Sequence, residues 1–426
     1  MIVIGGGFAG VTAAREAALR GCSVLLLEAR DRLGGRTWTV RWDGRQIEYG
    51  GAWVHWHQPH TFSELTRAGL AVVLGDDIHR AGWYVDGQRH SATLEERDAI
   101  AQRGWDRFVD GVEEALPLPH DPLHAIDKLR PFDRLTIAER VDQLDLDVEE
   151  RAVLTAELES LANAPLDDAG AVSVLRWHAL SGYSLALTQF TGGRVTIAQG
   201  TRALLDAIAS AVPYEQRLGT RVAAVSQDGQ GVEVQTGEGA GYRARVAVVA
   251  VPVNALGAVV FSPGLSEGKL GAIASGQASR GIKLFVHARG EPVLNNSIRP
   301  GHPFGYLASD ALLEDGTQLL IGFGRDASAC DAGDLAWVQR SLDELLPGYE
   351  VIQATAHDWL ADEFSRGTWA IHRPGWYEHH HATMQVPEGR VLFAGSDIAN
   401  GWAGFIDGAI ESGLRAGARA AKMSGE

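Results

Sequence analysis

Three glycines close to the start of the chain have the spacing of a phosphate-binding loop. Gly5, Gly7 and Gly10 follow an apolar segment, residues 1–4, and open a stretch rich in alanine. In such a loop the first glycine allows a tight turn, the second lets a pyrophosphate approach the backbone, and the third packs the helix on the strand. The helix that follows points its first N–H groups at the phosphate charge. The spacing therefore predicts a dinucleotide site.

An acidic residue stands where the ribose of a dinucleotide is bound. Glu28 follows a second apolar segment, residues 23–27, at about the distance from the glycines that a βαβ unit requires. A carboxylate at this point accepts hydrogen bonds from the ribose hydroxyls and repels a 2′-phosphate. This order of strand, loop, helix, strand and acid argues firmly against NADP as the cofactor. It distinguishes less well between NAD and FAD.

The choice between those two cofactors depends on the residues that follow Glu28. Residues 30–36 contain a pair of glycines between arginines, and residues 48–53 contain a second pair before a tryptophan. Paired glycines let the backbone lie against a flat ring or a phosphate, and Arg36 can neutralise pyrophosphate charge with directional hydrogen bonds. A simple nicotinamide dehydrogenase needs neither feature. At this point the sequence resembles the flavin-containing amine oxidase family.

The resemblance covers most of the chain and weakens in its helical middle. Residues 279–283 resemble the segment with the family's active-site lysine, residues 367–369 the loop with one wall of its aromatic cage, and residues 389–415 its last flavin-binding strand and helix. Within the family the chain is most similar to the bacterial nicotine-degrading members, nicotine oxidase and 6-hydroxynicotine oxidase. That similarity is carried by residues 51–60, 358–362 and 404–409.

The resemblance implies roles for particular residues. As catalytic residues, Lys283 would hold a water near flavin N5, while Trp369 and Phe405 would flank the amine and attract a cation to their faces. Asp397 would bind the ribityl or pyrophosphate part of FAD. The residues expected to bind the cofactor are Gly5, Gly7, Gly10, Glu28, Arg30, Gly35, Arg36, Gly50, Gly51, Ala52, Trp53, Val222, Gly395, Asp397, Phe405 and Ile406.

Two positions depart from the monoamine oxidases within this family. Thr368 stands where those enzymes have the cysteine that bonds to the flavin, and a hydroxyl cannot form the thioether. We therefore expect FAD to be bound non-covalently. The aromatic cage consists of Trp369 and Phe405, with phenylalanine in place of tyrosine, so the substrate does not carry over from the monoamine oxidases.

Histidines lie close to the glycine pair of residues 50–51. His55 and His57 are candidates to line the substrate pocket together with Trp369 and Phe405, although exposed loop histidines are at least as common. Neither the histidines near residue 57 nor the tract at residues 378–381 has the spacing of metal ligands with a third partner. We therefore predict no metal site.

These residues need a scaffold assembled from distant segments. Strand patterns appear at residues 221–225, 231–235 and 242–251, and the last forty residues repeat strand, loop and helix, whereas residues 61–188 have a helical pattern. We predict an α/β fold. Its Rossmann-type FAD-binding domain would comprise the discontinuous segments 1–70, 190–265 and 366–426. A mixed-sheet substrate-binding domain would comprise 71–189 and 266–365, with a helical insertion at about 90–188.

Composition limits the partners of this chain. A net charge of −16 disfavours nucleic acid and anionic membranes, and no apolar stretch approaches the roughly 18 residues of a membrane span. The chain begins directly with a strand, leaving no room for a leader. Cys22 and Cys330 lie too far apart for a redox motif. We expect a cytoplasmic protein, with a homodimer as the default assembly.

The resemblance implies oxidation of a small amine, and two other functions stay open. The carbon next to the amine nitrogen would give a hydride to flavin N5, and water would hydrolyse the resulting imine; nicotine-type secondary amines are candidates. The final acceptor would be O2 or another electron acceptor. An L-amino acid oxidase would need an arginine for the substrate carboxylate, and Arg176 is of the required type. A non-catalytic FAD-binding redox sensor would need only the cofactor pocket.

Overall fold

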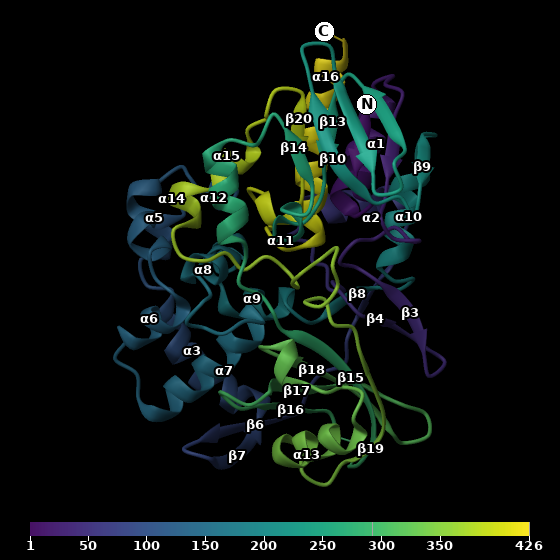
Figure 1. The fold of residues 1–426 in the computed structure, drawn as a ribbon. Helices are drawn as coiled ribbons and strands as arrows, with labels where there is room; N and C mark the ends of the chain where they lie inside the picture. Colours follow the sequence, from purple (N-terminus) through teal and green to yellow (C-terminus); the bar gives the residue numbers. More distant parts are fainter. Residues whose placement is uncertain (292, 426) are drawn as a thin grey trace.

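A parallel sheet of five strands carries the glycine loop. The computed structural model describes residues 1–291 and 293–425. In this sheet the strand order is β20-β13-β1-β2-β9, and every neighbouring pair is parallel. The sheet lies near the two termini, at the top of Figure 1. Its strands are β1 (Ile2–Ile4), β2 (Leu25–Leu27), β9 (Glu215–Arg217), β13 (Ala247–Val249) and β20 (Val391–Phe393).

Small residues let two helices cross closely beside this sheet. Helix α16 (Ile406–Gly425) packs along α1 (Phe8–Leu19). A Cβ on Gly417 would lie 2.5 Å from the carbonyl oxygen of Ala13, so this approach requires glycine. The first and last helices of the chain therefore cover the sheet together. The other helices in this half of the molecule are α2 (Pro59–Ala68), α10 (Thr201–Ser210), α11 (Val253–Leu256), α12 (Glu267–Ser275), α14 (Trp376–His379), α15 (His381–Gln385) and η2 (Ser396–Ile398).

A second sheet of four strands corrects one predicted element. The single strand predicted over residues 242–251 is two strands in different sheets, β12 (Gly241–Ala244) and β13. Strand β12 alternates between exposed and half-buried residues, whereas β13 is buried throughout. The chain thus passes from a solvent-facing ribbon into the central sheet within two residues. The order of the second sheet is β12-β11-β10-β14, with β10 (Val222–Gln227), β11 (Val232–Thr236) and β14 (Val260–Ser262).

A mixed sheet of seven strands forms the lower part of the molecule in Figure 1. Its order is β19-β15-β18-β17-β16-β6-β7, and helix α13 (Leu335–Leu345) packs on β19. The hairpin of β6 and β7 lies in a segment for which we predicted helices. It was missed because β7 is mostly exposed and polar, without the apolar alternation of a half-buried strand. The strands are β6 (Arg80–Val85), β7 (Gln88–Thr93), β15 (Ile282–Arg289), β16 (Asn295–Ile298), β17 (Phe304–Leu312), β18 (Gln318–Gly324) and β19 (Glu350–Ala356).

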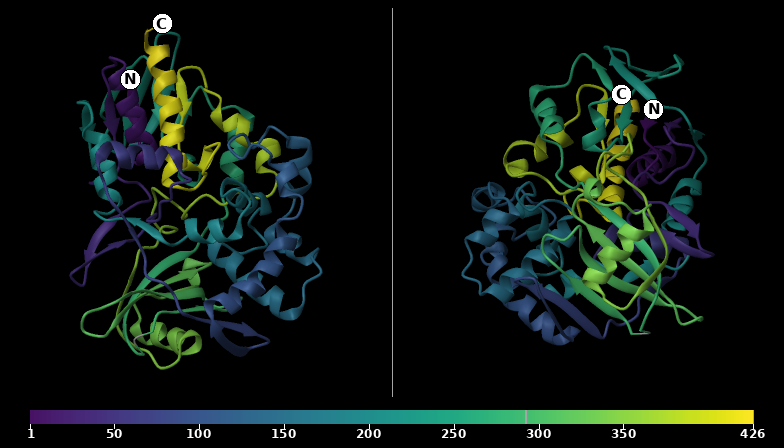
Figure 2. Two further views of the ribbon diagram at one scale, coloured as in Figure 1. Left: turned by 180° about the vertical axis from the view of Figure 1, so that it is seen from behind. Right: turned by 60° about the horizontal axis from the view of Figure 1, so that its bottom comes forward.

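The predicted helical insertion is present beside the seven-stranded sheet (Figure 2). Capping boxes begin three of its helices, with Thr93, Thr136 and Asp147 each bonded to the backbone N–H of a glutamate three residues later. The helices are α3 (Leu94–Phe108), α4 (Val112–Ala115), α5 (Ile126–Asp133), α6 (Ile137–Asp142), α7 (Val148–Ala162), α8 (Ala171–Leu180) and α9 (Leu185–Thr191). The remaining elements are β3 (Thr39–Trp42), β4 (Arg45–Glu48), β5 (Val72–Leu74), β8 (Val195–Ile197) and η1 (Ala327–Ala329).

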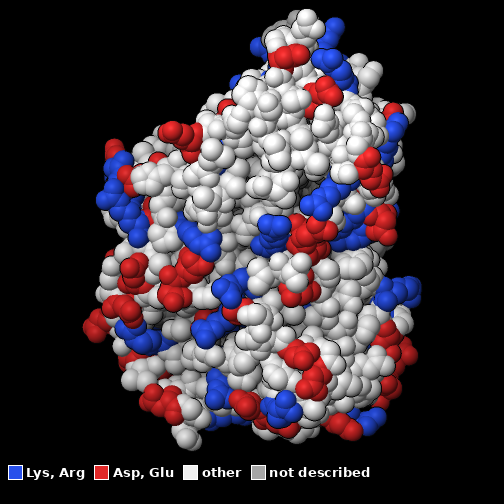
Figure 3. Space-filling model, viewed as in Figure 1, with Lys and Arg blue, Asp and Glu red and all other residues white. Residues whose placement is uncertain are grey.

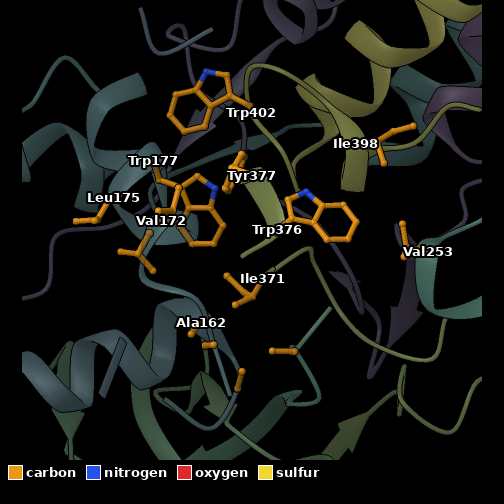
Figure 4. Close-up of a cluster of buried hydrophobic side chains, with 14 of the residues drawn as sticks. Ala162, Val172, Leu175, Trp177, Val253, Ile371, Trp376, Tyr377, Ile398 and Trp402 are labelled. Atoms are coloured by element: carbon orange, nitrogen blue, oxygen red, sulfur yellow. The ribbon is translucent and has the colours of Figure 1, made fainter. Parts of the chain in front are cut away.

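The helical insertion shares a hydrophobic core with the loops at the end of the chain. Trp177 of α8, Ile371 and Trp402 belong to one buried cluster, which Figure 4 shows in close-up.

Among the described residues, no helix is long and apolar enough to cross a bilayer. Basic and acidic side chains are interspersed on the face shown in Figure 3. The five-stranded parallel sheet and the seven-stranded mixed sheet confirm the predicted α/β fold. The boundaries given above for the two domains stay a prediction.

Candidate active site

The glycine loop lies at one end of a long cavity. Gly5 has a φ of +102°, and a Cβ on Gly10 would collide with the carbonyl oxygen of Gly5, so both positions require glycine. Gly7 directly precedes helix α1, and the nearest atom to a Cβ placed on it is 3.7 Å away. The start of α1 therefore leaves room for a ligand, and its free N–H groups favour a negatively charged one.

Glu28 lies beside this loop at the end of β2. Its Oε2 accepts a hydrogen bond of 2.5 Å from the N–H of Gly6, and its Oε1 accepts one of 2.8 Å from the N–H of Arg30. The side chain is buried but lines the cavity. The loop and the turn after β2 therefore hold the carboxylate in one orientation. Arg30 in turn donates to Asp362 at 2.6 Å and to Ser365 at 2.9 Å.

Arg36 and Asp397 bind each other. The Arg36 guanidinium donates to the Asp397 carboxylate, to the Ser396 hydroxyl at 3.0 Å and to the carbonyl of Thr368 at 2.8 Å. Asp397 also accepts from the N–H of Val253 at 3.0 Å. Burial raises the pKa of Asp397, but the charge and hydrogen bond of Arg36 hold it below its ordinary value.

This ion pair changes what we expect of Asp397. Arg36 lines the cavity and Asp397 does not, although a direct bond from Asp397 to the cofactor was predicted. The carboxylate instead holds the guanidinium, which joins segments of the chain more than three hundred residues apart. Asp397 therefore acts on the cavity through Arg36.

Lys283 of strand β15 lines the same cavity. Its Nζ donates to the carbonyl oxygens of Glu48 at 2.9 Å and Gly50 at 2.6 Å, and lies 4.9 Å from the centre of the Trp53 ring. The side chain is 4% exposed. Burial lowers the pKa of Lys283 to about 8, against the opposing charges of Glu48 and Asp310. The ammonium group of Lys283 is therefore buried and easily deprotonated.

Trp369 and Phe405 line the other end of the cavity. Trp369 is fixed by a hydrogen bond of 3.0 Å from its Nε1 to the carbonyl of Leu161. Gly404 has a φ of +86°, and a Cβ on it would lie 3.1 Å from the backbone N of Ala370, so the loops that carry the two aromatic residues touch each other. The close approach of these loops brings Trp369 and Phe405 to one end of the cavity.

Three further aromatic residues line this end of the cavity and were missed in the sequence. The Phe323 ring lies 6.0 Å from Trp369 and 5.6 Å from Trp53, and the rings of Trp177 and Trp402 lie 5.3 Å and 5.2 Å from Phe405. Phe323 pairs with Lys283 across β15 and β18. A pairing of those two predicted strands would have found Phe323, but no local pattern distinguishes Trp177 or Trp402 from ordinary core residues.

Most residues predicted to bind the cofactor lie around this cavity. Gly10 and Asp397 are outside its lining, the first because it packs α1 on β1 and the second because it holds Arg36. The predicted residues that line the cavity are Gly5, Gly7, Glu28, Arg30, Gly35, Arg36, Gly50, Gly51, Ala52, Trp53, Val222, Gly395, Phe405 and Ile406.

His55 and His57 are not among the cavity-lining residues. The His55 ring is fully buried against Phe190, at 5.3 Å, and its Nδ1 accepts from the N–H of His57 at 3.1 Å. Burial lowers the pKa of His55 to about 4. His55 is therefore a neutral packing residue beside Phe190, and His57 also lies outside the cavity lining. No group of potential metal ligands was found within residues 1–291 and 293–425.

Arg176 is also outside the cavity lining. Its guanidinium donates to the Tyr377 hydroxyl at 2.6 Å and to the carbonyls of Asn400 and Gly401. The two-pronged grip on a substrate carboxylate that an L-amino acid oxidase needs is therefore not available from this residue.

The cavity has the length and the chemistry for a flavin dinucleotide. It contains about 2160 Å³ of space free of protein atoms, its open mouth included, and runs continuously from the glycine loop to Trp369 and Phe405. A helix N-terminus and Arg36 stand where a pyrophosphate needs positive partners. Thr368 also lines the cavity, and its hydroxyl is bonded to Asn163 at 2.9 Å and to Ser279 at 2.8 Å. The residues present therefore fit the cofactor.

Comparisons with known proteins agree with this geometry. Residues 8–421 match the family model described as flavin containing amine oxidoreductase. The chain is 37% identical over 425 residues to pseudooxynicotine dehydrogenase of a Pseudomonas species, covering 98% of this chain and 85% of that protein. It is 31% identical over 421 residues to (S)-6-hydroxynicotine oxidase of Paenarthrobacter nicotinovorans, covering 96% of each.

Solved structures show the same fold. Putrescine oxidase bound to putrescine has a TM-score of 0.83 at 23% identity, covering 98% of each chain. Cyclohexylamine oxidase from Brevibacterium oxydans has a TM-score of 0.81 at 23% identity, covering 99% of this chain and 98% of the other. With a family model matched over nearly its whole length and relatives above 30% identity, this chain belongs to the flavin-containing amine oxidoreductase family.

Proposed function

We propose that this protein binds FAD non-covalently and oxidises a small amine of the nicotine type. The observation that carries the proposal is the single cavity that joins the glycine loop to Lys283, Trp369 and Phe405. Bound flavin would supply the hydride acceptor for the carbon next to the amine nitrogen. The protein's own residues bind and orient the two partners.

In this proposal the cofactor is bound by backbone N–H groups and by two charged side chains. The N–H groups at the start of α1 would bind the pyrophosphate, Glu28 would accept from the ribose hydroxyls, and Arg36 would balance the phosphate charge. Thr368 supports non-covalent binding, because a threonine hydroxyl cannot make a thioether and here already hydrogen-bonds to neighbouring side chains.

The aromatic end of the cavity favours a neutral amine. Oxidation requires a free nitrogen lone pair, and removal of water by the rings of Trp369, Phe405 and Phe323 lowers the pKa of an amine. Lys283 is positively charged below a pH of about 8 and further disfavours a second cation nearby. The amine would thus lose its proton on entry, with no dedicated base.

The relatives support a nicotine-type substrate. Two of them are named for nicotine-related compounds and are 37% and 31% identical over nearly the whole chain. We propose a secondary or cyclic amine that carries an aromatic ring, with O2 or another electron acceptor as oxidant. We also propose a cytoplasmic homodimer; both cysteines are free, in agreement with a reducing compartment.

The test is an anaerobic titration of the purified yellow protein. Candidate amines are (S)-nicotine, (S)-6-hydroxynicotine and pseudooxynicotine, with putrescine and cyclohexylamine as comparison substrates. Bleaching by the nicotine-type amines, followed by release of free FAD on denaturation, is the expected result. If no amine in the panel reduces the flavin, the proposed oxidation of a small amine is refuted; a redox sensor would in addition require that flavin reduction changes the binding of a partner. Colour that stays with the denatured chain contradicts non-covalent binding.

A further inference from the structure

One face of helix α8 reaches the aromatic end of the cavity. Trp177 and Ser181 lie one helical turn apart, Ser181 at the C-terminal cap, and both line the cavity. The sequence motifs did not identify either residue as part of the cavity, because α8 belongs to the segment in which the family resemblance is weakest. The helical insertion therefore supplies part of the wall near Phe405.

Helix α8 is fixed firmly to the loop that carries Phe405. Arg176 donates to the carbonyl of Gly401 at 2.7 Å, and Trp177 Nε1 donates to the carbonyl of Ala403 at 3.2 Å. The Trp177 ring meets the Phe405 ring edge-on, at 5.3 Å and 87°. Figure 4 shows Trp177 and Trp402 in the same buried cluster. The position of Ser181 relative to the aromatic cage is therefore set by several contacts.

The Ser181 hydroxyl is buried without a hydrogen-bond partner. The residue is 0% exposed, and Oγ makes no hydrogen bond to any residue that the structure describes. Nearby cavity-lining hydroxyls differ: Thr188 donates to the carbonyl of Ser184 at 2.8 Å, and Thr191 to that of Leu187 at 2.7 Å. Serine and threonine hydroxyls in helices can bond to the carbonyl four residues earlier, and a buried unpaired hydroxyl is costly.

We propose that Ser181 determines substrate specificity by donating a hydrogen bond to the part of the substrate remote from the amine. The acceptor would be a heteroaromatic nitrogen or a ketone oxygen. The amine end is assigned to the space at Trp369 and Phe405; Trp177 contacts Phe405, and Ser181 follows Trp177 by one helical turn along α8. A substrate that fills both regions presents its far end to Ser181. This inference rests on the proposed amine oxidation.

The test compares substrates that differ only in this acceptor. One pair is (S)-nicotine and N-methyl-2-phenylpyrrolidine, which differ by a ring nitrogen. The other is 4-(methylamino)-1-phenylbutan-1-one and N-methyl-4-phenylbutan-1-amine, which differ by a ketone. Anaerobic flavin reduction is followed for the wild-type holoenzyme and for Ser181→Ala. Ser173→Ala is the matched control, since this α8 serine accepts from the N–H of His372 at 2.9 Å.

The wild type should prefer the acceptor-bearing member of at least one pair by about tenfold or more in kcat/KM, equivalent to about 1.4 kcal/mol. Ser181→Ala should reduce that preference to near unity without lowering the Tm, because it removes no hydrogen bond within the protein. Ser173→Ala should lower the Tm and keep the preference. The inference is overturned if the wild type shows no preference, or if Ser181→Ala retains it. Absence of flavin reduction by every amine would instead refute the proposed function.

Discussion

Lys283 is buried strongly enough to make the stability of this protein depend on pH. Burial lowers its pKa from 10.5 to about 8, and each pKa unit corresponds to 1.36 kcal/mol. The charged form is therefore disfavoured in the folded protein by about 3 kcal/mol. This cost persists despite the two hydrogen bonds to the carbonyls of Glu48 and Gly50.

The sign of the effect follows from proton binding. Between pH 8 and pH 10.5 the unfolded chain keeps the Lys283 proton while the folded protein loses it. Stability rises with pH wherever the unfolded state binds more protons. The contribution of Lys283 to the free energy of unfolding is thus least favourable below pH 8 and improves by about 3 kcal/mol by pH 10.5. Methionine has similar length and no charge, so Lys283→Met lacks this dependence.

The assay is urea unfolding of the wild type and Lys283→Met from pH 7 to pH 10.5, at one fixed concentration of free FAD. The wild type should gain about 3 kcal/mol relative to the variant across this range. Lys422→Met, which changes an exposed lysine near the C-terminus, serves as the control and should follow the wild-type profile. Parallel profiles for wild type and Lys283→Met would refute the assignment of a depressed pKa to this lysine.

Three further predictions concern the cofactor loop and the aromatic cage. Arg36→Met strands the buried Asp397 carboxylate and should lower the free energy of unfolding by about 3–5 kcal/mol; a loss below 1 kcal/mol in urea unfolding would argue against the pair. Gly10→Ala collides with the Gly5 carbonyl, so the purified variant should lack the flavin absorption band, and a fully yellow protein would contradict this. Phe405→Ala should retain flavin while kcat/KM for amines falls about tenfold, as measured by anaerobic bleaching; unchanged kcat/KM would remove Phe405 from the substrate site.

Local patterns singled out residues that the structure brings together around one cavity. The glycine loop, Glu28 and the glycine pair at residues 50–51 depend on spacings of a few residues within one βαβ unit and its continuation. The structure places these residues around one cavity, apart from Gly10, whose steric role is within the loop itself. Such motifs are readable because the chemistry of the ligand constrains neighbouring residues directly.

Contacts between distant segments could not be predicted in the same way. Asp397 was expected to bind the cofactor, and in the structure it binds Arg36 and lies outside the cavity lining. His55 was one of two candidates for the substrate pocket, and its ring packs against Phe190. A carboxylate or an imidazole can bind several kinds of group, and only the three-dimensional arrangement decides which of them lies close enough. The segment of β6 and β7 shows the same limit, since its pairing with β16 rather than its own pattern makes it a strand.

The sequence alone thus determined the family and its flavin cofactor, and it proposed Trp369 and Phe405 as an aromatic pair, because those features are short motifs with a fixed local geometry. Tertiary structure decided which other residues line the cavity: Phe323 enters through strand pairing with Lys283, and Trp177 and Ser181 enter through the docking of α8 on the loop of residues 400–404. Those contacts have no sequence period, since they join surfaces whose approach depends on the packing of the whole chain.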